Sequence, residues 1–148
     1  VRVLGIIDQA ILRERWLGAL GYPTTFNNTK IATRRCTNIE RATLNATSHD
    51  MFRGSDSNRF NELSKIVAMP MYGGDCYAYG LLASGHIDLI VEADLKPYDF
   101  LALVPVISGA GGCITDWQGN TLDMSSDGRI IATGDATILP EVIRTLNA

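Results

Sequence analysis

The sequence predicts an α/β fold, a mixed β-sheet flanked by helices and preceded by a β-hairpin. Short apolar runs alternate with helical patterns from about residue 42 onward, which indicates an α/β layer. Residues 1 to about 35 instead contain strand patterns and turns. A content of 46% hydrophobic and 20% charged residues is that of an ordinary globular protein.

The first 35 residues are predicted to contribute only strands. One strand covers residues 1–7 and a second covers 15–20, with a polar bend between them; a turn and a short strand follow over 22–28. Two or three strands alone are marginally stable, so we expect them to extend a sheet whose other strands lie elsewhere. This divides the chain into terminal β-strands, 1–35, and an α/β domain, 36–148.

In the second part, hydrophobic periodicity and Gly/Pro punctuation mark the elements. Gly73 and Gly74 permit a sharp turn before a helix with Asp75 as its N-cap, and Gly85 ends that helix. Pro97 starts the next helix, and Pro105 is expected to kink it. The predicted elements are a strand over 42–47, a helix over 58–67, a strand over 67–71, a helix over 75–84, a strand over 87–91, a helix over 97–108, strands over 113–116 and 130–133, and a last helix with Leu139, Val142, Ile143 and Leu146 on its apolar face.

Three carboxylates, Asp75, Glu92 and Asp99, stand at the ends of predicted elements, where functional sites are commonly built. Each also has a structural interpretation: Asp75 as an N-cap, Glu92 as a solvated strand end, and Asp99 as an aspartate that caps the helix or pairs with its positive end. Asp99 alternatively supplies a ligand to Mg²⁺, which prefers carboxylate oxygens and often shares its sphere with phosphate. One Asp is too few for a metal site made by protein alone. Asp88, inside a strand, is interpreted as a hydrogen-bonded structural group.

Charge and composition exclude several classes of partner. A net charge of −3 with scattered basic residues argues against a nucleic-acid surface. No run approaches the roughly 20 apolar residues of a membrane helix, so no membrane partner is expected. The cysteines are far apart and lack a CxxC spacing, which favours reduced cytoplasmic packing residues over a zinc site. They are Cys36, Cys76 and Cys113.

Several other side chains receive a structural interpretation. Trp16 and Trp117 are expected to be packing anchors, and Tyr77 and Tyr79 core or rim residues. Four further polar residues are expected to lie in loops exposed to solvent, and the loop of His49 could border the site. These are Arg34, Arg35, His49 and His86.

Glu92 and Asp99, seven residues apart, with a helix that ends in Ala110-Gly111-Gly112, resemble the second signature of the inositol monophosphatase family. In that signature an aromatic-Asp pair opens a helix ending in Ala-Gly-Gly; the aromatic is usually Trp and is Tyr98 here. The segments GGDCYAY (73–79), LKPYDF (95–100) and GIIDQ…LRERW (5–16) are more similar to the branch that hydrolyses histidinol phosphate. The resemblance spans nearly the whole chain.

The resemblance implies a Mg²⁺-dependent phosphomonoesterase, commonly a homodimer, acting on a small-molecule phosphate monoester. Within it Asp99 corresponds to a metal ligand. Glu92, Asp75 and Gly74 fall where the family contacts the organic half of the substrate. Two carboxylates there suit histidinol phosphate, an intermediate of histidine biosynthesis that carries an ammonium group, better than inositol phosphate.

The chain departs from the family pattern in one respect. The family's other metal ligands, in a glutamate-containing segment and an Asp-Pro-Ile-Asp-Gly-Thr-like motif, do not occur in these 148 residues. The chain therefore resembles the C-terminal half of such an enzyme, with residues 1–35 as the last strands of an incomplete N-terminal domain. The isolated polypeptide is predicted to be inactive, because a lone Asp99 cannot hold the metal ions.

Alternative functions remain open. The chain could belong to another phosphatase of the same family that acts on inositol or a nucleotide phosphate, or it could be a non-catalytic fragment or binding module. A nucleotide-binding module built on residues 109–112 is disfavoured, because those glycines end a helix and do not start one.

Overall fold

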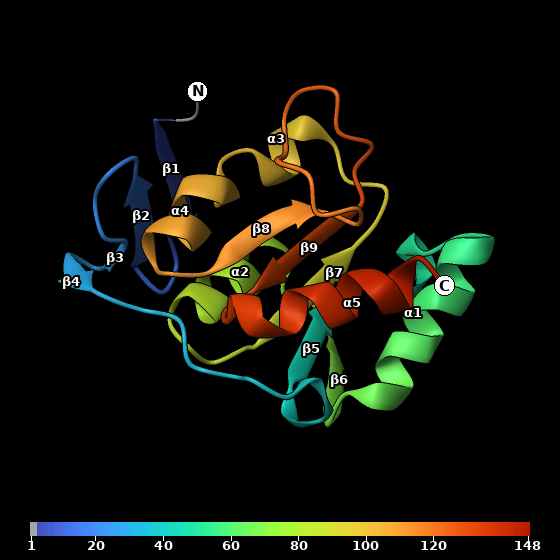
Figure 1. Ribbon diagram of the computed structural model, residues 1–148. Helices are drawn as coiled ribbons and strands as arrows, with labels where there is room; N and C mark the ends of the chain where they lie inside the picture. The colour runs from blue at the N-terminus through green and yellow to red at the C-terminus, as the bar shows by residue number, and fades with distance from the viewer. Residues whose placement is uncertain (1–2) are drawn as a thin grey trace.

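The computed structural model describes residues 3–148, which contain two β-sheets (Figure 1). The first sheet is antiparallel and the second is mixed. In spatial order the first consists of β1 (Leu4–Gln9), β2 (Glu14–Ala19), β3 (Thr25–Phe26) and β4 (Thr29–Lys30). The second consists, also in spatial order, of β6 (Met69–Tyr72), β5 (Thr43–Ala46), β7 (Leu89–Glu92), β9 (Ile130–Thr133) and β8 (Cys113–Asp116).

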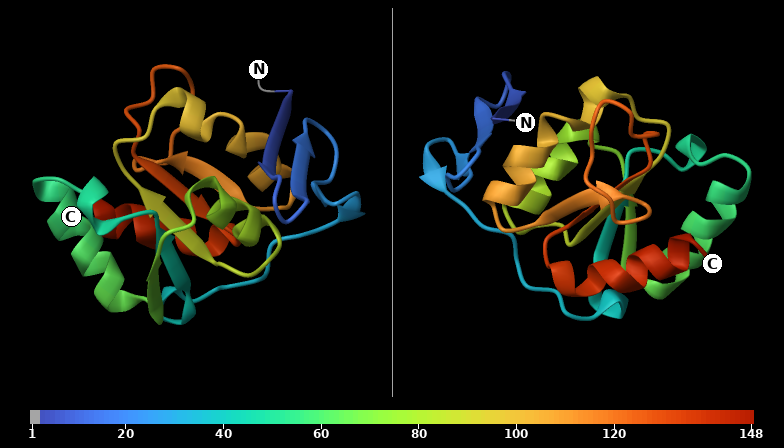
Figure 2. Two further views of the ribbon diagram at one scale, coloured as in Figure 1. Left: turned by 180° about the vertical axis from the view of Figure 1, so that it is seen from behind. Right: turned by 45° about the horizontal axis from the view of Figure 1, so that its top comes forward.

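The helices cover both faces of the second sheet (Figure 2). Two apolar cores result, one between the sheet, α2, α4 and the hairpin, and one between the sheet, α1 and α5. The α-helices are α1 (Ser55–Ile66), α2 (Asp75–Ala83), α3 (Pro97–Phe100), α4 (Leu103–Gly109) and α5 (Leu139–Leu146). Short 3₁₀ turns are η1 (Ile39–Arg41), η2 (His49–Met51) and η3 (Ala136–Ile138). The predicted α/β class with a mixed sheet and a preceding hairpin is confirmed.

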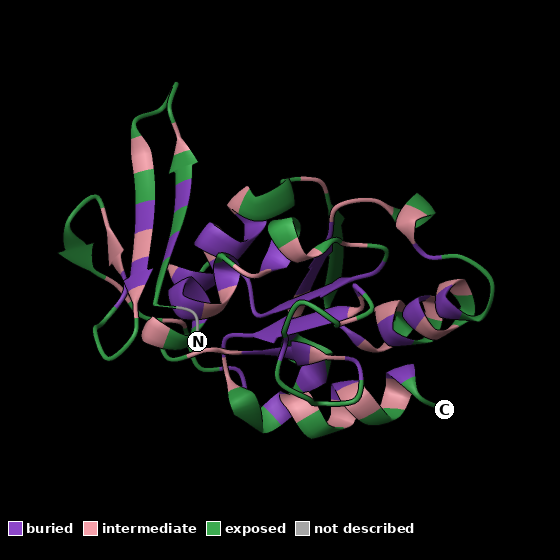
Figure 3. Cartoon of the chain, turned by 90° about the horizontal axis from the view of Figure 1, so that it is seen from above, coloured by how far each residue is buried: buried purple, intermediate pink, exposed green. Residues whose placement is uncertain are grey.

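The hairpin β1–β2 packs on α4 through two glycines. A Cβ at Gly5 would lie 1.8 Å from the carbonyl oxygen of Ala102, and one at Gly18 would lie 2.4 Å from that of Pro105. Because side chains alternate across a strand, buried residues alternate with exposed ones in the first half of β1 and with half-buried ones in the second half of β2, as the bands along the two strands show (Figure 3). Residues 1 and 2 of the predicted first strand lie outside the described residues. The domain division at residue 35 stays a prediction.

Strand β7 is the centre of the second sheet. It pairs in parallel with β5 and antiparallel with β9, and all four of its residues are buried. A strand buried on both faces is expected to be continuously apolar, and Leu-Ile-Val fits that rule until Glu92 ends the run. Because β5 and β7 are parallel, their carboxyl ends lie at the same edge of the sheet, where a ligand site is expected.

Several predicted element boundaries need correction, and α1 starts at Ser55, before the expected residue 58. The helix expected over 97–108 is two helices, because α3 ends at Phe100 and α4 starts at Leu103. Proline at position 105 has no N–H to donate to the carbonyl of Leu101, so the chain breaks where that bond would form. The strand expected over 67–71 lies at Met69–Tyr72, because Val67 is the C-cap of α1. No helix within residues 3–148 is long and apolar enough to span a membrane.

Candidate active site

A cleft of about 410 Å³ lies where β5 and β7 end and where α2 and α3 begin. It brings together three of the four site residues predicted from the sequence, Asp75, Glu92 and Asp99, whereas Gly74 does not line it. A larger cavity of about 770 Å³ lies between the hairpin and α4, with Tyr22 and Lys30 as its ionisable groups. The cleft is lined by Thr47, Asp75, Cys76, Tyr79, Glu92, Leu95, Tyr98, Asp99 and Leu103.

Glu92 is a buried carboxylate, with 2% of its surface exposed, so the interpretation as a solvated strand end is wrong. Its Oε1 accepts hydrogen bonds from the backbone N–H of Thr47, at 3.1 Å, and from the Thr47 hydroxyl. Its Oε2 accepts the hydroxyl of Tyr79 at 2.6 Å. Burial raises the pKa of the Glu92 carboxyl, although these hydrogen bonds lower it and offset part of the cost. The carboxyl is thus held in place by neutral donors.

Tyr79 and Thr47, which bind the Glu92 carboxylate, were not identified as site residues from the sequence. Tyr79 projects from α2 and is 1% exposed. Burial and then the neighbouring Glu92 carboxylate raise the pKa of Tyr79 well above its ordinary value, so the phenol stays a donor. Thr47 directly follows β5, 45 residues before Glu92. The sequence did contain a signal for Thr47, because it is a polar residue directly after a buried strand. It contained none for Tyr79, which lies within an apolar helical run.

Asp99 lies in the first turn of α3, and its side chain is exposed to the cleft. Its Oδ2 accepts the backbone N–H of Lys96 at 2.8 Å, which confirms the capping interpretation. Within residues 3–148, Oδ1 accepts no hydrogen bond, so this oxygen is available to a ligand. Capping and ligand binding are therefore compatible at Asp99.

Asp75 is the first residue of α2 and not its N-cap, which corrects the sequence prediction. The N-cap is Gly74, with φ 100° and no side chain to cap with. Gly73 (φ 95°), Gly74 and Asp75 (φ 45°) form a run of three left-handed residues, and Asp is among the few side chains that tolerate this region. Left-handed backbone at a non-glycine residue costs of order 1 kcal/mol and is concentrated at functional sites. This turn directs the Asp75 carboxylate into the cleft.

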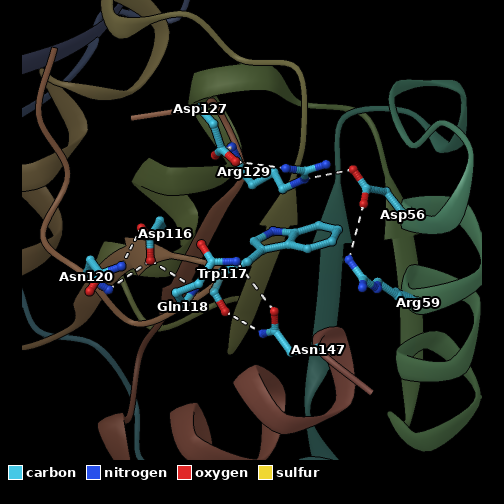
Figure 4. A network of polar contacts seen from close by, with 9 residues as sticks. All are labelled: Asp56, Arg59, Asp116, Trp117, Gln118, Asn120, Asp127, Arg129 and Asn147. Carbon is cyan, nitrogen blue, oxygen red and sulfur yellow. Dashed lines mark hydrogen bonds and ion pairs between the residues drawn. The ribbon is translucent and has the colours of Figure 1, made fainter. Parts of the chain in front are cut away.

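The connection from Glu92 to Asp99 rests on the loop before β9. The backbone N–H of Leu95 donates to the carbonyl of Gly128 at 3.2 Å, and a Cβ at Gly128 would lie 2.1 Å from the carbonyl oxygen of Leu95. Arg129 anchors this loop by ion pairs of 2.8 Å to Asp56 and 2.8 Å to Asp127 (Figure 4). The ion pairs of Arg129 thus hold the loop on which the connection from Glu92 to Asp99 rests.

Trp117 lies under this network. Its ring is fully buried, and the guanidinium carbon of Arg129 is 5.8 Å from the ring centroid (Figure 4). The side-chain amide of Asn147 donates to the Trp117 carbonyl at 2.7 Å, joining the end of α5 to this core. Trp16, 1% exposed, anchors the other core. Both tryptophans are packing anchors, as predicted.

The other polar residues and cysteines singled out from the sequence lie outside the cleft, with the exception of Cys76. Asp88 is a structural group, as predicted: both its oxygens accept hydrogen bonds from Arg34 at 2.6 Å, so Arg34 is not merely solvated. His49 hydrogen-bonds Asn61 and does not line the cleft. Cys76 is the exception, because it is exposed at the cleft and is not the buried packing residue that was expected.

The described residues do not form a complete metal centre. Within residues 3–148 no three His, Cys, Asp or Glu side chains are grouped so that they could hold a metal ion. Asp99 fits one coordination position, because its Oδ1 is unpartnered and exposed. Glu92 is a poor second ligand, because Thr47 and Tyr79 already occupy all but one of the acceptor positions of its two oxygens.

Comparisons with known proteins agree on one family. The profile of the inositol monophosphatase family matches residues 1–148. The chloroplastic bifunctional phosphatase IMPL2 of Arabidopsis thaliana is 44% identical over 151 residues, covering 97% of this chain and 44% of its own length. A histidinol-phosphatase of Chlorobaculum parvum is 27% identical over 130 residues, covering 87% of this chain and 50% of its own.

The solved structure of an inositol monophosphatase from Zymomonas mobilis has a TM-score of 0.97 and 43% sequence identity. The match covers 99% of this chain and 58% of that chain. The chain thus spans about half the length of the curated relatives it matches.

Proposed function

The chain belongs to the inositol monophosphatase family, and on this premise we propose that it contributes the substrate side of a phosphomonoesterase. The observation that carries the proposal is the composition of the cleft. Among its lining residues, all of them within the described part of the chain, three are carboxylates and none is Lys, Arg or His. The compensating positive charge must then come from a ligand, which is the pattern expected for metal ions and cationic substrates.

Asp99 is proposed as the metal ligand of this cleft, through its unpartnered Oδ1. Mg²⁺ is the proposed ion, since it binds through one or two carboxylates together with substrate phosphate. When bound, such ions activate water and stabilise the leaving oxygen in phosphate ester hydrolysis. Further metal ligands would have to come from outside these 148 residues.

Glu92 and Asp75 are proposed to bind the organic half of the substrate, with the turn at Gly74 setting the position of Asp75. The favoured substrate is histidinol phosphate, because its ammonium group complements two carboxylates. Relatives named as a bifunctional phosphatase and a histidinol-phosphatase support this choice. Inositol phosphate is the second candidate: its hydroxyl groups can also donate to Glu92, and the solved structure at 43% identity is that of an inositol monophosphatase.

The test uses the product of the complete reading frame that contains this chain, with Mg²⁺ present. We expect phosphate release from histidinol phosphate with a higher kcat/KM than from inositol 1-phosphate. Asp99→Asn should lower kcat for both by on the order of 10³-fold, because it removes a metal ligand. Asp75→Asn and Glu92→Gln should each reduce the preference for histidinol phosphate by about tenfold, as expected for one charged hydrogen bond.

Asp94→Asn is the matched control. Asp94 lies on the same connection but outside the cleft, where it pairs with Lys96 at 3.1 Å. It should change neither kcat nor the substrate preference. If Asp75→Asn and Glu92→Gln leave the preference intact, the histidinol phosphate assignment is wrong. If Asp99→Asn keeps full turnover, the phosphatase proposal fails for this cleft.

The isolated 148-residue polypeptide gives a second test. We predict negligible Mg²⁺-dependent phosphate release from it, because a single exposed carboxylate cannot hold catalytic metal ions. The assay compares this polypeptide with the product of the complete reading frame, after circular dichroism has shown that both are folded. Turnover by the 148-residue chain alone would contradict the prediction. The homodimeric assembly and cytoplasmic location also stay predictions, open to light scattering and cell fractionation.

A further inference from the structure

Glu92 has a nearly complete set of hydrogen bonds before any ligand binds. An ionised carboxylate offers about four acceptor positions. Three are occupied, by the Thr47 N–H and hydroxyl on Oε1 and by the Tyr79 hydroxyl on Oε2. One position is left, and because the side chain is 2% exposed, a ligand can reach that position only from the cleft that Glu92 lines.

The three donor groups belong to two residues, and these two residues and the acceptor Glu92 lie in separate parts of the fold. Thr47 follows β5, Tyr79 is on α2, and Glu92 ends β7. A carboxylate fixed from two sides cannot change its rotamer without losing a hydrogen bond in a buried site, which is costly. The Thr47 backbone N–H can only donate, so Oε1 stays an acceptor. The remaining acceptor direction at Glu92 is therefore set by Tyr79 and Thr47.

We infer that Tyr79 and Thr47 are positioning residues that present Glu92 as a fixed acceptor for a single donor, an ammonium group, on the organic half of the substrate. The inference rests on the proposed function and assigns specificity within it. The charged groups that face Glu92 from the surrounding elements are Asp75 on α2 and Asp99 on α3, both acidic. A cationic donor gains a charge-assisted hydrogen bond to Glu92 and attraction to the Asp75 carboxylate, whereas a neutral hydroxyl gains only the hydrogen bond to Glu92.

The fold provides a matched control two residues away. Tyr77 lies on the same helix, but its hydroxyl donates to Glu14 of the hairpin at 2.7 Å, and it does not line the cleft. Tyr77→Phe and Tyr79→Phe each remove one phenol hydroxyl that donates to a glutamate. Only Tyr79→Phe frees Glu92. At the other donor, Thr47→Val removes the hydroxyl while Thr47→Ser keeps it.

The experiment measures ligand binding, so that it does not depend on turnover. Histidinol, and its analogue with a hydroxyl in place of the amine, are titrated calorimetrically into the product of the complete reading frame. We expect Tyr79→Phe and Thr47→Val to weaken histidinol binding by about tenfold, with a smaller effect on the analogue. Tyr77→Phe and Thr47→Ser should bind histidinol like the wild type. Thermal unfolding and circular dichroism identify variants that fail to fold.

The two proposals fail in different ways. Equal losses in Tyr77→Phe and Tyr79→Phe, equal losses for amine and hydroxyl ligands, or no histidinol binding by the wild type would each overturn the inference. Phosphate release is measured separately on the same proteins. Tyr79→Phe should then raise KM for histidinol phosphate about tenfold with kcat within about twofold, since it removes a contact common to ground state and transition state. Absence of phosphate release by the wild type overturns the proposed function and leaves the binding result valid.

Discussion

The two ends of β7 carry buried carboxylates in contrasting environments. Asp88, before the strand, and Glu92, at its end, are both 2% exposed, and each accepts a backbone N–H from a threonine at an end of the neighbouring β5. At Asp88 the chain supplies a cation, because Arg34 binds both carboxylate oxygens at 2.6 Å. At Glu92 the chain supplies only neutral donors. One end is electrostatically complete, and the other leaves its positive partner to a ligand.

The largest effect on stability is expected at the Asp88 end of β7, where Arg34 supplies the cation. Arg34→Ala would leave the buried Asp88 carboxylate without its cation; because the Arg34 side chain is 44% exposed, water replaces part of the interaction, and the free energy of unfolding should fall by about 2 kcal/mol. Urea unfolding measures this loss. Arg35→Ala is the control, because Arg35 is also exposed but forms no ion pair among the described residues, and it should change stability by less than about 0.5 kcal/mol. Equal effects of the two variants would show that Asp88 does not depend on its cation.

The Glu92 end of β7, where the chain supplies no cation, should make a contribution to stability that depends on pH. Burial raises the pKa of Glu92 in the folded state above its ordinary value of 4.5. Between these two pKa values, the folded state keeps a proton on Glu92 that the unfolded state has lost. Stability from this group is fully present below pH 4.5 and is lost as pH rises through the folded-state value. The stability of the wild type relative to Glu92→Gln should therefore fall as pH rises above 4.5. Urea unfolding of both proteins at several pH values tests the sign, and a constant difference would contradict it.

The smallest effect on stability is expected at Asp75, which lines the cleft together with Glu92. Asn also tolerates a φ of 45°, so Asp75→Asn should change the free energy of unfolding by less than about 0.5 kcal/mol. Asp75→Val should cost about 1–2 kcal/mol, because a β-branched residue is strained there. Thermal unfolding compares the two. Since the Asp75 charge also contributes to the raised pKa of Glu92, Asp75→Asn should lower that pKa. Equal stabilities of the Asp75→Asn and Asp75→Val proteins would mean that the turn relaxes.

Much of the fold was predictable from local pattern. The strands at 113–116 and 130–133 and the apolar face of α5 follow from short apolar runs and helical spacing, and the structure confirms them. The environment of the carboxylates was not predictable in the same way. Thr47 lies 45 residues from Glu92, and the Tyr79 hydroxyl is polar while its ring fits an apolar helix face. Asp75 was assigned as a cap because two preceding glycines leave the start of the helix ambiguous by one residue.

The placement of the two tryptophans, one in each core, gives the protein a separate optical reporter for each layer. Trp16 reports on the layer of the hairpin, where its indole donates to Ser84 at 2.8 Å and packs edge-on against Tyr77. Trp117 reports on the opposite layer, beneath a guanidinium group. Two single-tryptophan proteins would therefore emit from opposite faces of one sheet. Their fluorescence would distinguish detachment of the hairpin from melting of the sheet, two events that a single global signal merges.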